Sequence, residues 1–404
     1  MGKRLTIGDN DLIKNLNLGI VLDTIRTEGA VSRAGISKLT GLSKSTCSLM
    51  VEKLLRSGLI IEKGKDHSSG GRKPVLLQIN YEAGRTVGIK FMADRIIAAL
   101  VDLNGNAVKI IEKPVPFPVD QKEYFASLED VISNLLDFQQ NGVERRKVLG
   151  IGIGMSGLID SEEGVSLQSS ILHWDNIPIK RILEARFQIP VYLENDVNTF
   201  ALGEKWFGFG KEIENFICVT IGKGIGIGII IDGKLYRGSH HGAGEFGHMK
   251  ISSDEDAPLC SCGHRGCIEG FASDPAICRY VEQSITEGKE SILKGEKAIT
   301  ISKVLNAARK GDTLCLEAFK RAGYYLGYGL SNLINLFDPD TIIIGGEGTA
   351  AGEFIFPEME SVIHTTSIYG LDTKVKILPL YYEDNLWVRG AATLVIREIF
   401  KIPF

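Results

Sequence analysis

The chain has 404 residues, of which 44% are hydrophobic and 24% are charged, which is typical of globular proteins with two or three domains. It contains no apolar run long enough to span a membrane and no secretory signal, so we expect a cytoplasmic protein. The net charge of −4 is unevenly distributed: residues 1–80 contain 13 Lys and Arg against 7 Asp and Glu, whereas the remainder contains 33 and 43. This asymmetry predicts that only the basic N-terminal region contacts nucleic acid, unless it is a chance variation in surface charge.

Apolar spacing predicts three short helices in the first 60 residues. The first covers Asn17–Arg26, Ser32 can cap the second, and Ser43 can cap the third after a turn at Gly41. Two short helices joined by a glycine-containing turn are typical of a helix-turn-helix. The inward face of the third helix is expected to consist of Leu49, Val51, Leu54 and Leu55.

The first turns of the third helix are rich in short hydroxyl side chains. Such side chains, together with a lysine, can bond base edges and phosphates in a major groove without steric hindrance. Some of them can also serve only to position the helix on phosphates. We therefore predict DNA contacts for Ser43, Lys44, Ser45, Thr46 and Ser48.

Two β-rich runs follow the third helix, Leu59–Gly64 and Val75–Ile79, and they predict the hairpin of a winged helix-turn-helix. The loop between them contains Gly71, Arg72 and Lys73, and it resembles an AT-hook. Glycine lets the backbone approach DNA closely, and the two cations can then enter a narrow minor groove. The alternative is a solvated basic loop, but the neighbouring helix-turn-helix favours DNA contact.

From about residue 85 the chain alternates between apolar strands and helices, which predicts an α/β fold. Two successive β-rich units indicate two lobes, and ligands of such folds bind at strand ends or between lobes. The expected strands are Val87–Phe91, Ile96–Leu103, Val148–Met155, Val191–Glu194, Phe216–Ile221 and Thr341–Ile344, with a helix over Tyr124–Gln139.

The C-terminal part contains a cluster of three cysteines near a histidine. In a reducing compartment, such a cluster more often binds metal than forms disulfides. Three thiolates and one imidazole favour Zn²⁺ in a closed structural site. The predicted ligands are His248, Cys260, Cys262 and Cys267, whereas His264 is expected to be a surface residue.

Five motifs occur in one order, and this order resembles that of ROK proteins (repressors, open reading frames, kinases). With the Ser-Ser-Gly-Gly-Arg-Lys-Pro loop, the chain is most similar to the xylose-repressor-type branch, and the resemblance covers essentially the whole chain. The combined Glu-x-Gly-His and Cys-x-Cys-Gly-x-x-Gly-Cys-x-Glu signature is highly specific. The motifs are Gly150–Gly157, Glu194–Asp196, Gly222–Gly228, Gly244–His248 and Cys260–Glu269.

The resemblance implies a winged helix-turn-helix over residues 1–82, followed by a two-lobed, actin-like and sugar-kinase-like (ribonuclease H-like) ROK domain. The first lobe is expected over residues 83–200 and is completed by the C-terminal helix, about residues 385–404. Residues 201–384 are expected to form the second lobe, which contains the zinc knuckle. The same four metal ligands are implied, and zinc is expected to brace one wall of the sugar site.

The resemblance also implies a sugar site of hydroxyl-binding side chains. Ser170 departs from the family kinases, which commonly carry Asn there. Helix capping by Asn195 and Asp196, and a surface location of Glu245, are the alternatives. In kinases the residue matching Asp196 is a general base, but here it can act simply as a hydrogen-bond acceptor. The predicted sugar-binding residues are Gly157, Ser170, Asn195, Asp196, Glu245, His248 and Glu269.

The phosphate-binding segment departs from that of the ROK kinases, which carry Asp-x-Gly-Gly-Thr-Lys after the first strand. Lys90 replaces the Asp, and Phe91–Asp94 replace the small turn. Gly222–Gly224 reads Gly-Lys-Gly where Gly-Thr-Gly is usual. Since phosphoryl transfer depends on positioning the phosphates, we predict a protein with no catalytic residues that is not an enzyme.

Together these features predict a sugar-responsive transcriptional repressor of carbohydrate-utilisation genes. A glucose-like aldose or xylose would bind between the lobes of a homodimer, or of a dimer of dimers, and release operator DNA. Two alternatives remain open: a sugar kinase or bifunctional kinase-regulator, and a regulator controlled by a protein partner. The sequence also leaves open whether the sugar is an inducer or a co-repressor.

Overall fold

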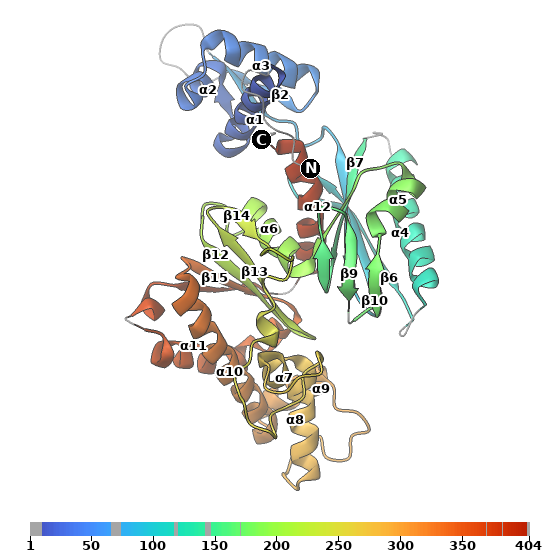
Figure 1. Ribbon diagram of the computed structural model, residues 1–404, viewed down its shortest axis with the longest axis vertical. Coiled ribbons are helices and arrows are strands. Elements are labelled where there is room, and N and C mark those ends of the chain that lie inside the picture. Colours follow the sequence, from blue (N-terminus) through green and yellow to red (C-terminus); the bar gives the residue numbers. More distant parts are fainter. Residues whose placement is uncertain are drawn as a thin grey trace.

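The structure is a computed structural model that describes residues 10–65, 74–116, 120–141, 147–169, 171–368, 370–381 and 383–401 (Figure 1). A small N-terminal module lies at one end of a larger α/β body, and the C-terminal helix reaches the module (Figure 1). Within the described residues, no helix is long and apolar enough to cross a membrane.

The N-terminal module has three helices and a three-stranded sheet. Ser32 caps the second helix by accepting a hydrogen bond from the Gly35 amide, and Gly41 ends this helix in the left-handed conformation at φ 72°. Ser43 caps the third helix by accepting one from the Thr46 amide. The elements are α1 (Asn10–Glu28), β1 (Val31–Ser32), α2 (Arg33–Thr40), α3 (Lys44–Arg56), β2 (Ile60–Lys65) and β3 (Val75–Ile79).

The predicted helices and the antiparallel β2–β3 pairing are confirmed, and together they form a winged helix-turn-helix arrangement. The prediction that Leu49 faces inward is wrong, because its side chain is 50% exposed. The buried stripe of α3 follows the i, i+3, i+4, i+7 spacing, and Leu49 lies one residue, about 100°, away from it. That stripe consists of Cys47, Met50, Val51 and Leu54.

The first lobe is built on a five-stranded sheet with the order β11-β7-β4-β5-β6. The helices α4 (Gln121–Asn141) and α5 (Ile179–Phe187) pack on one face of it, and a small sheet of β8, β9 and β10 lies beside them. The strands are β4 (Arg85–Phe91), β5 (Arg95–Asp102), β6 (Ala107–Pro114), β7 (Val148–Met155), β8 (Leu158–Asp160), β9 (Val165–Ser169), β10 (Trp174–Ile177) and β11 (Val191–Asn195).

The second lobe is built on another five-stranded sheet, with the order β14-β13-β12-β15-β16. Its strands are β12 (Phe216–Ile221), β13 (Ile225–Ile231), β14 (Lys234–Tyr236), β15 (Thr341–Gly345) and β16 (Lys376–Pro379). Its remaining elements are η1 (Phe246–His248), α7 (Ile268–Ala272), α8 (Asp274–Thr286), α9 (Ile301–Arg309), α10 (Thr313–Phe337), η2 (Glu347–Ala351), α11 (Gly352–Thr366) and η3 (Leu371–Thr373).

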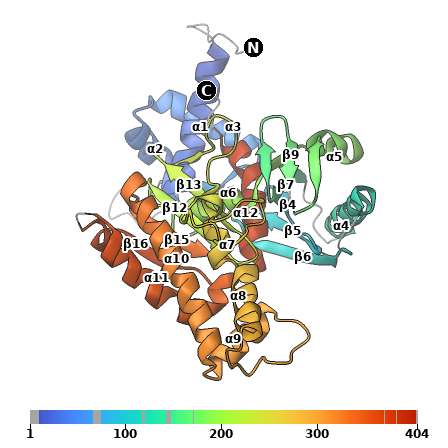
Figure 2. The ribbon, with the colours of Figure 1, turned by 60° about the horizontal axis from the view of Figure 1, so that its bottom comes forward.

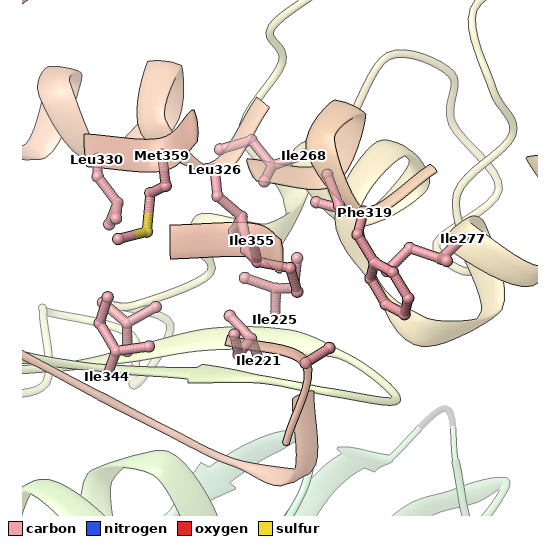
Figure 3. Packing of buried hydrophobic residues seen from close by; sticks show 14 of the residues in the cluster. Ile221, Ile225, Ile268, Ile277, Phe319, Leu326, Leu330, Ile344, Ile355 and Met359 are labelled. Atoms are coloured by element: carbon pink, nitrogen blue, oxygen red, sulfur yellow. The ribbon is translucent and has the colours of Figure 1, made fainter. Parts of the chain in front are cut away.

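A large apolar core fills the space between the second sheet and its helices. Figure 3 shows Ile344 on β15 facing Leu330 on α10 and Met359 on α11. Residues from α7, α8 and α9 extend the same cluster. This packing fixes the short helix α7, which holds part of the candidate site described below.

The two sheets have the same connectivity. Each begins with three antiparallel strands, β4-β5-β6 or β12-β13-β14, and adds two parallel strands beside the first one, β7 and β11 or β15 and β16. The expected two-lobed α/β fold is therefore confirmed. The turns that follow β4 and β12 occupy equivalent positions in the two lobes.

Two helices lie between the sheets, α6 (Asp196–Phe207) and α12 (Asp384–Phe400) (Figures 1 and 2). The helix α12 packs on β4 and β7, and α6 packs on β13. Their contact with the strands is close, since a Cβ added to Gly152 on β7 would lie 1.9 Å from the Ala391 carbonyl oxygen. The two helices also touch each other, because a Cβ on Gly390 would lie 2.4 Å from the Thr199 carbonyl oxygen.

Candidate ligand-binding and metal sites

A cavity of about 370 Å³ opens between the lobes, next to the N-terminus of α6. It falls within the volume range of small-molecule sites in proteins. Ser170 lies outside the described residues. The other six predicted sugar residues all line this cavity: Gly157, Asn195, Asp196, Glu245, His248 and Glu269.

Asn195 connects the cavity to the start of α6. Its side-chain oxygen accepts hydrogen bonds from the amides of Val197 and Asn198, at 2.9 and 3.3 Å. Its amide nitrogen donates to the Gly157 carbonyl oxygen at 3.1 Å, and Gly157 has φ 113°, which favours glycine. Helix capping and a place in the cavity are therefore not alternatives for Asn195, because the residue does both.

Asp196 has a buried cationic partner. One of its carboxylate oxygens accepts a hydrogen bond from the Val197 amide, and the other accepts one from the Lys90 ammonium. The Lys90 side chain is only 8% exposed, and its ammonium lies 4.2 Å from the centre of the Trp387 ring. A carboxylate in an ion pair with an ammonium can still accept further hydrogen bonds.

Lys90 and Trp387 were not predicted as part of the candidate site, although both line the cavity. Lys90 stands where the family kinases are expected to have an acidic residue, but the sequence alone relates that substitution only to a loss of phosphate binding. Trp387 had no comparable signal. It reaches the cavity because the C-terminal helix returns to the first sheet.

Two glutamates form the opposite wall. Glu269, on α7, accepts hydrogen bonds from the Ile225 amide at 3.2 Å and from the Ser261 hydroxyl. Glu245 precedes η1, and burial raises the pKa of its carboxyl; the charges of Glu269 and Asp196 act in the same direction, and His248 opposes them. The wall offers carboxylate oxygens on both sides, which suits a ligand rich in hydroxyl groups.

The four predicted metal ligands, His248, Cys260, Cys262 and Cys267, lie together behind this wall, with their ligand atoms all within 4.8 Å of one another. The Cys260 sulfur lies 3.4 Å from Nδ1 of His248, and the Cys262 and Cys267 sulfurs lie 3.7 Å apart. Three thiols and one imidazole at these distances fit a metal ion. His264 is exposed, as expected, although its Nδ1 lies 3.6 Å from the Cys262 sulfur.

His248 faces both the metal cluster and the cavity. Its Nδ1 points to Cys260, and its Nε2 lies 3.8 Å from a carboxylate oxygen of Glu245. Burial raises the pKa of Cys260 to about 12 in the absence of a metal charge. Burial acts in the same direction on Cys262, but hydrogen bonds from His264, Cys260 and Cys267 outweigh it and lower its pKa to about 6.

The turn between β4 and β5 occupies the other end of the cavity. Met92 and Ala93 line it, and the Met92 amide closes the turn on the Arg95 carbonyl oxygen at 3.1 Å. Asp94 in this turn forms an ion pair of 3.1 Å with Lys223, which lies in the turn between β12 and β13. The two turns are thus connected by their own side chains.

In the N-terminal module, the predicted DNA-contact residues of α3 lie on its outer side. Ser43, Lys44, Ser45 and Ser48 are exposed, and Thr46 is partly exposed. The loop residues Gly71, Arg72 and Lys73 lie outside the described residues.

The ROK family model matches residues 86–398, so the chain belongs to the ROK family. It is 35% identical to the xylose repressor of Caldicellulosiruptor bescii, over 98% of this chain and 99% of that protein. A solved structure of a ROK family transcriptional regulator, a homolog of the Escherichia coli MLC protein, is 30% identical and superposes with a TM-score of 0.85 over 96% of this chain and 97% of that one.

The α/β body also resembles an enzyme of the same family. A ROK family glucokinase from Streptomyces griseus, solved with glucose and AMPPNP, is 31% identical over 76% of this chain and 98% of its own, with a TM-score of 0.66. The share of this chain outside that match is close to the length of the N-terminal module. The chain therefore combines a kinase-like body with an additional module.

Proposed function

We propose that this protein is a sugar-responsive, DNA-binding transcriptional repressor of carbohydrate-utilisation genes. The observation that supports this most is the combination of an exposed, hydroxyl-rich α3 N-terminus on the module with a carboxylate-lined cavity whose Asp196 is paired with Lys90. The relative from Caldicellulosiruptor bescii is named a xylose repressor, and it matches the chain along almost its whole length.

The effector is a small neutral sugar, a glucose-like aldose or xylose. The cavity is lined by four carboxylates, Asp196, Glu245, Glu269 and Glu347, against the two ammonium groups of Lys90 and Lys223. Both ammonium groups already have a carboxylate partner. An anionic ligand would therefore meet an excess of negative charge, whereas sugar hydroxyls can donate to the carboxylates. Ser170 completes the proposed site.

The protein is not an enzyme in this proposal. A sugar kinase needs an acceptor for the hydroxyl proton and a small turn that lets the backbone approach the phosphates. Here the candidate base Asp196 is in an ion pair with Lys90, and Met92 occupies the turn. A kinase remains the second candidate, because the body resembles the glucokinase.

The Cys₃His cluster holds a structural Zn²⁺ through His248, Cys260, Cys262 and Cys267. Zinc bound there would cross-link these four side chains and so order the loop between η1 and α7. The chain's own contribution is the orientation of His248, whose second ring nitrogen faces Glu245 and the cavity. This arrangement lets the same imidazole donate to, or accept from, a sugar hydroxyl.

The module binds operator DNA through Ser43, Lys44, Ser45, Thr46 and Ser48 in a major groove. Gly71, Arg72 and Lys73 of the loop reach the minor groove. A cytoplasmic homodimer, or a dimer of dimers, would hold two modules at a fixed spacing on a palindromic operator.

The division of the chain follows the same logic. We assign residues 1–82 to the DNA-binding module, 83–200 with about 385–404 to the first lobe, and 201–384 to the second lobe. The packing of α12 on β4 and β7 supports the return of the C-terminal residues to the first lobe.

Three measurements on the purified full chain test this function. A sugar panel in a thermal shift assay identifies the effector, because a ligand of the native state raises the melting temperature. Binding to DNA fragments selected from random sequence is then measured with and without that sugar. We expect the sugar to weaken DNA binding, and no ADP to form from ATP. Rapid sugar-dependent ADP release, or DNA affinity that no bound sugar changes, would reject the proposal.

A matched variant separates the two modules. Arg72→Ala should weaken DNA binding and leave the sugar affinity unchanged, because the loop lies in a different part of the chain from the cavity residues. Loss of both would point to misfolding or to a wrong assignment of the DNA-binding residues.

A further inference from the structure

Both central helices connect the sugar cavity to the core of the DNA-binding module. The helix α6 begins with Asp196 in the cavity and ends at Trp206 and Phe207, which pack against the apolar core of the module. The helix α12 has Trp387 at the cavity in its first turn and Phe400 in that same core. Figure 1 shows α12 running from the interlobe region to the module.

The far ends of the helices contact each other and the module. The rings of Trp206 and Phe400 lie 5.7 Å apart, and the guanidinium of Arg26, on α1, lies 4.5 Å from the centre of the Trp206 ring. Ile396 and Phe400 belong to one apolar cluster with buried residues of α1 and α3. A displacement of either helix therefore acts directly on the packing of the module.

The two helices are joined so closely that they should move as a unit. Gly390 of α12 approaches the backbone of α6, where an added Cβ would lie 2.4 Å from the Thr199 carbonyl oxygen. Arg389 of α12 forms an ion pair of 3.0 Å with Glu204 of α6, whose side chain is 1% exposed. Close-packed interfaces of this kind transmit a displacement instead of absorbing it.

At the cavity end, one side chain contacts the first turns of both helices. The Lys90 ammonium donates to Asp196 at the start of α6 and lies over the Trp387 ring in the first turn of α12. A buried ammonium depends on its partners, because desolvation makes an unpaired charge costly. Lys90 will therefore shift whenever Asp196 changes partners.

We propose that Lys90 is the positioning residue through which an occupied sugar cavity changes the placement of the DNA-binding module. This inference rests on the proposed function of the cavity as a sugar site. A sugar hydroxyl that donates to Asp196 adds a third donor to a carboxylate that already accepts from the Val197 amide and the Lys90 ammonium, and so weakens the attraction between this carboxylate and the ammonium. The ammonium then moves relative to Trp387, and the joined helices carry the change to Phe400, about 20 Å along α12.

The decisive quantity is the coupling factor, the ratio of DNA affinity without sugar to DNA affinity at saturating sugar. It does not depend on how tightly the sugar binds, so a loss of coupling is separated from a loss of sugar affinity. D-xylose and D-glucose serve as sugar probes, and the DNA is a fragment that the wild-type chain selects from random sequence. Calorimetry gives the sugar affinity of each variant and so defines saturation.

Three lysine variants are compared with the wild type. Lys90→Met removes the charge at similar length, Lys90→Arg keeps it, and Lys113→Met is the matched control, because Lys113 pairs with Asp130 on the outside of the first lobe. We expect a wild-type coupling factor of about five or more. It should fall to within about twofold of unity in Lys90→Met, recover in part in Lys90→Arg, and stay unchanged in Lys113→Met.

One further variant, at Trp387, keeps the inference testable if Lys90→Met does not fold or binds no sugar. Trp387→Leu leaves the Lys90–Asp196 ion pair in place but removes the ring between the ammonium and α12, so it should also lower the coupling factor. A Trp387→Leu or Lys90→Met chain whose coupling matches the wild type would overturn the inference. A wild-type chain that binds D-xylose or D-glucose without any change in DNA affinity would instead reject the proposed function, and the inference with it.

Discussion

The turns after β4 and β12 occupy equivalent positions in the two lobes and face the same cleft, yet they differ in sequence and in what they contact. The turn in the second lobe keeps both glycines, Gly222 and Gly224, and the amide of Ile225 just after it donates to Glu269. The turn in the first lobe contains Met92, which lines the cleft, and it follows the strand that contributes Lys90.

This difference divides the cleft into two ends. The end near the second lobe presents the Glu245 and Glu269 carboxylates and the His248 imidazole, which suit sugar hydroxyls, whereas the end near the first lobe is occupied by Met92 and by Asp94, which pairs with Lys223. A kinase requires both ends at once, because it must hold a sugar and a triphosphate. A sugar sensor holds no triphosphate, so side chains such as Met92 can fill the turn after β4 without loss of the sugar-binding groups.

The largest effect on ligand binding should come from removing a metal ligand of the second lobe, which tests whether the sugar end depends on the cluster behind it. In Cys260→Ser, the metal content should fall from one ion per chain to almost none, measured by elemental analysis. Sugar affinity should then fall by about 10–100-fold, because His248 loses the partner that orients it. Cys278→Ser, a partly buried cysteine outside the cluster, is the control. Unchanged sugar affinity in a metal-free Cys260→Ser chain would contradict this dependence.

The sequence predicted the groups of the candidate site that come from compact motifs. The Glu194–Asp196 motif ends a strand and begins a helix, so its place at a strand end follows from local pattern alone. The metal cluster was predictable for the same reason, since Cys260, Cys262 and Cys267 are close in the chain and His248 precedes them by one loop.

The contacts of Lys90 could not be predicted in this way. Its partners Asp196 and Trp387 are distant in sequence, and they meet because the C-terminal helix returns between the two sheets. Local periodicity predicts that a residue is helical, but it does not predict which strand that helix packs on. The prediction for Leu49 was wrong for a local reason. Leu49 lies one residue, about 100° around α3, away from the buried stripe.

A second prediction compares how tightly the central helices pack on the two sheets. In Gly152→Ala the new Cβ would lie 1.9 Å from the backbone oxygen of Ala391, whereas in Gly228→Ala its nearest neighbour is the Cβ of Ala201 at 2.7 Å. We expect Gly152→Ala to lower the free energy of unfolding by about 3 kcal/mol or more, and Gly228→Ala by about 1–2 kcal/mol. Urea denaturation measures both values. Gly242→Ala, with no atom closer than 3.6 Å, should change stability by less than about 0.5 kcal/mol.

The reverse order of Gly152→Ala and Gly228→Ala would mean that α12 adapts to the first sheet more easily than α6 adapts to the second. That result would weaken the view that the C-terminal helix is a rigid connection from the cavity to the module.

The smallest effect concerns the ion pair between the two turns. Asp94 and Lys223 are 48% and 58% exposed, so a double-mutant cycle with Asp94→Asn and Lys223→Met should give a coupling energy of about 0.2–1 kcal/mol at neutral pH. Burial of Asp94 acts against its ionisation, but the hydrogen bond and charge of Lys223 outweigh it and lower the pKa of this carboxyl. The coupling should therefore be fully present above the ordinary pKa of aspartate, about 4, and disappear as the pH falls through the lowered value.

Urea denaturation of the four chains at neutral and acidic pH, each at low and high salt, measures this coupling. If Lys223 lowers the pKa of Asp94 by its charge, the coupling energy should decrease at acidic pH and at high salt. A coupling energy that persists in acid would assign the connection between the turns to packing and not to charge. The first-lobe end of the cleft would then be closed by the shape of Met92 and its neighbours, and exchanging the charges alone could not reopen it to a phosphate.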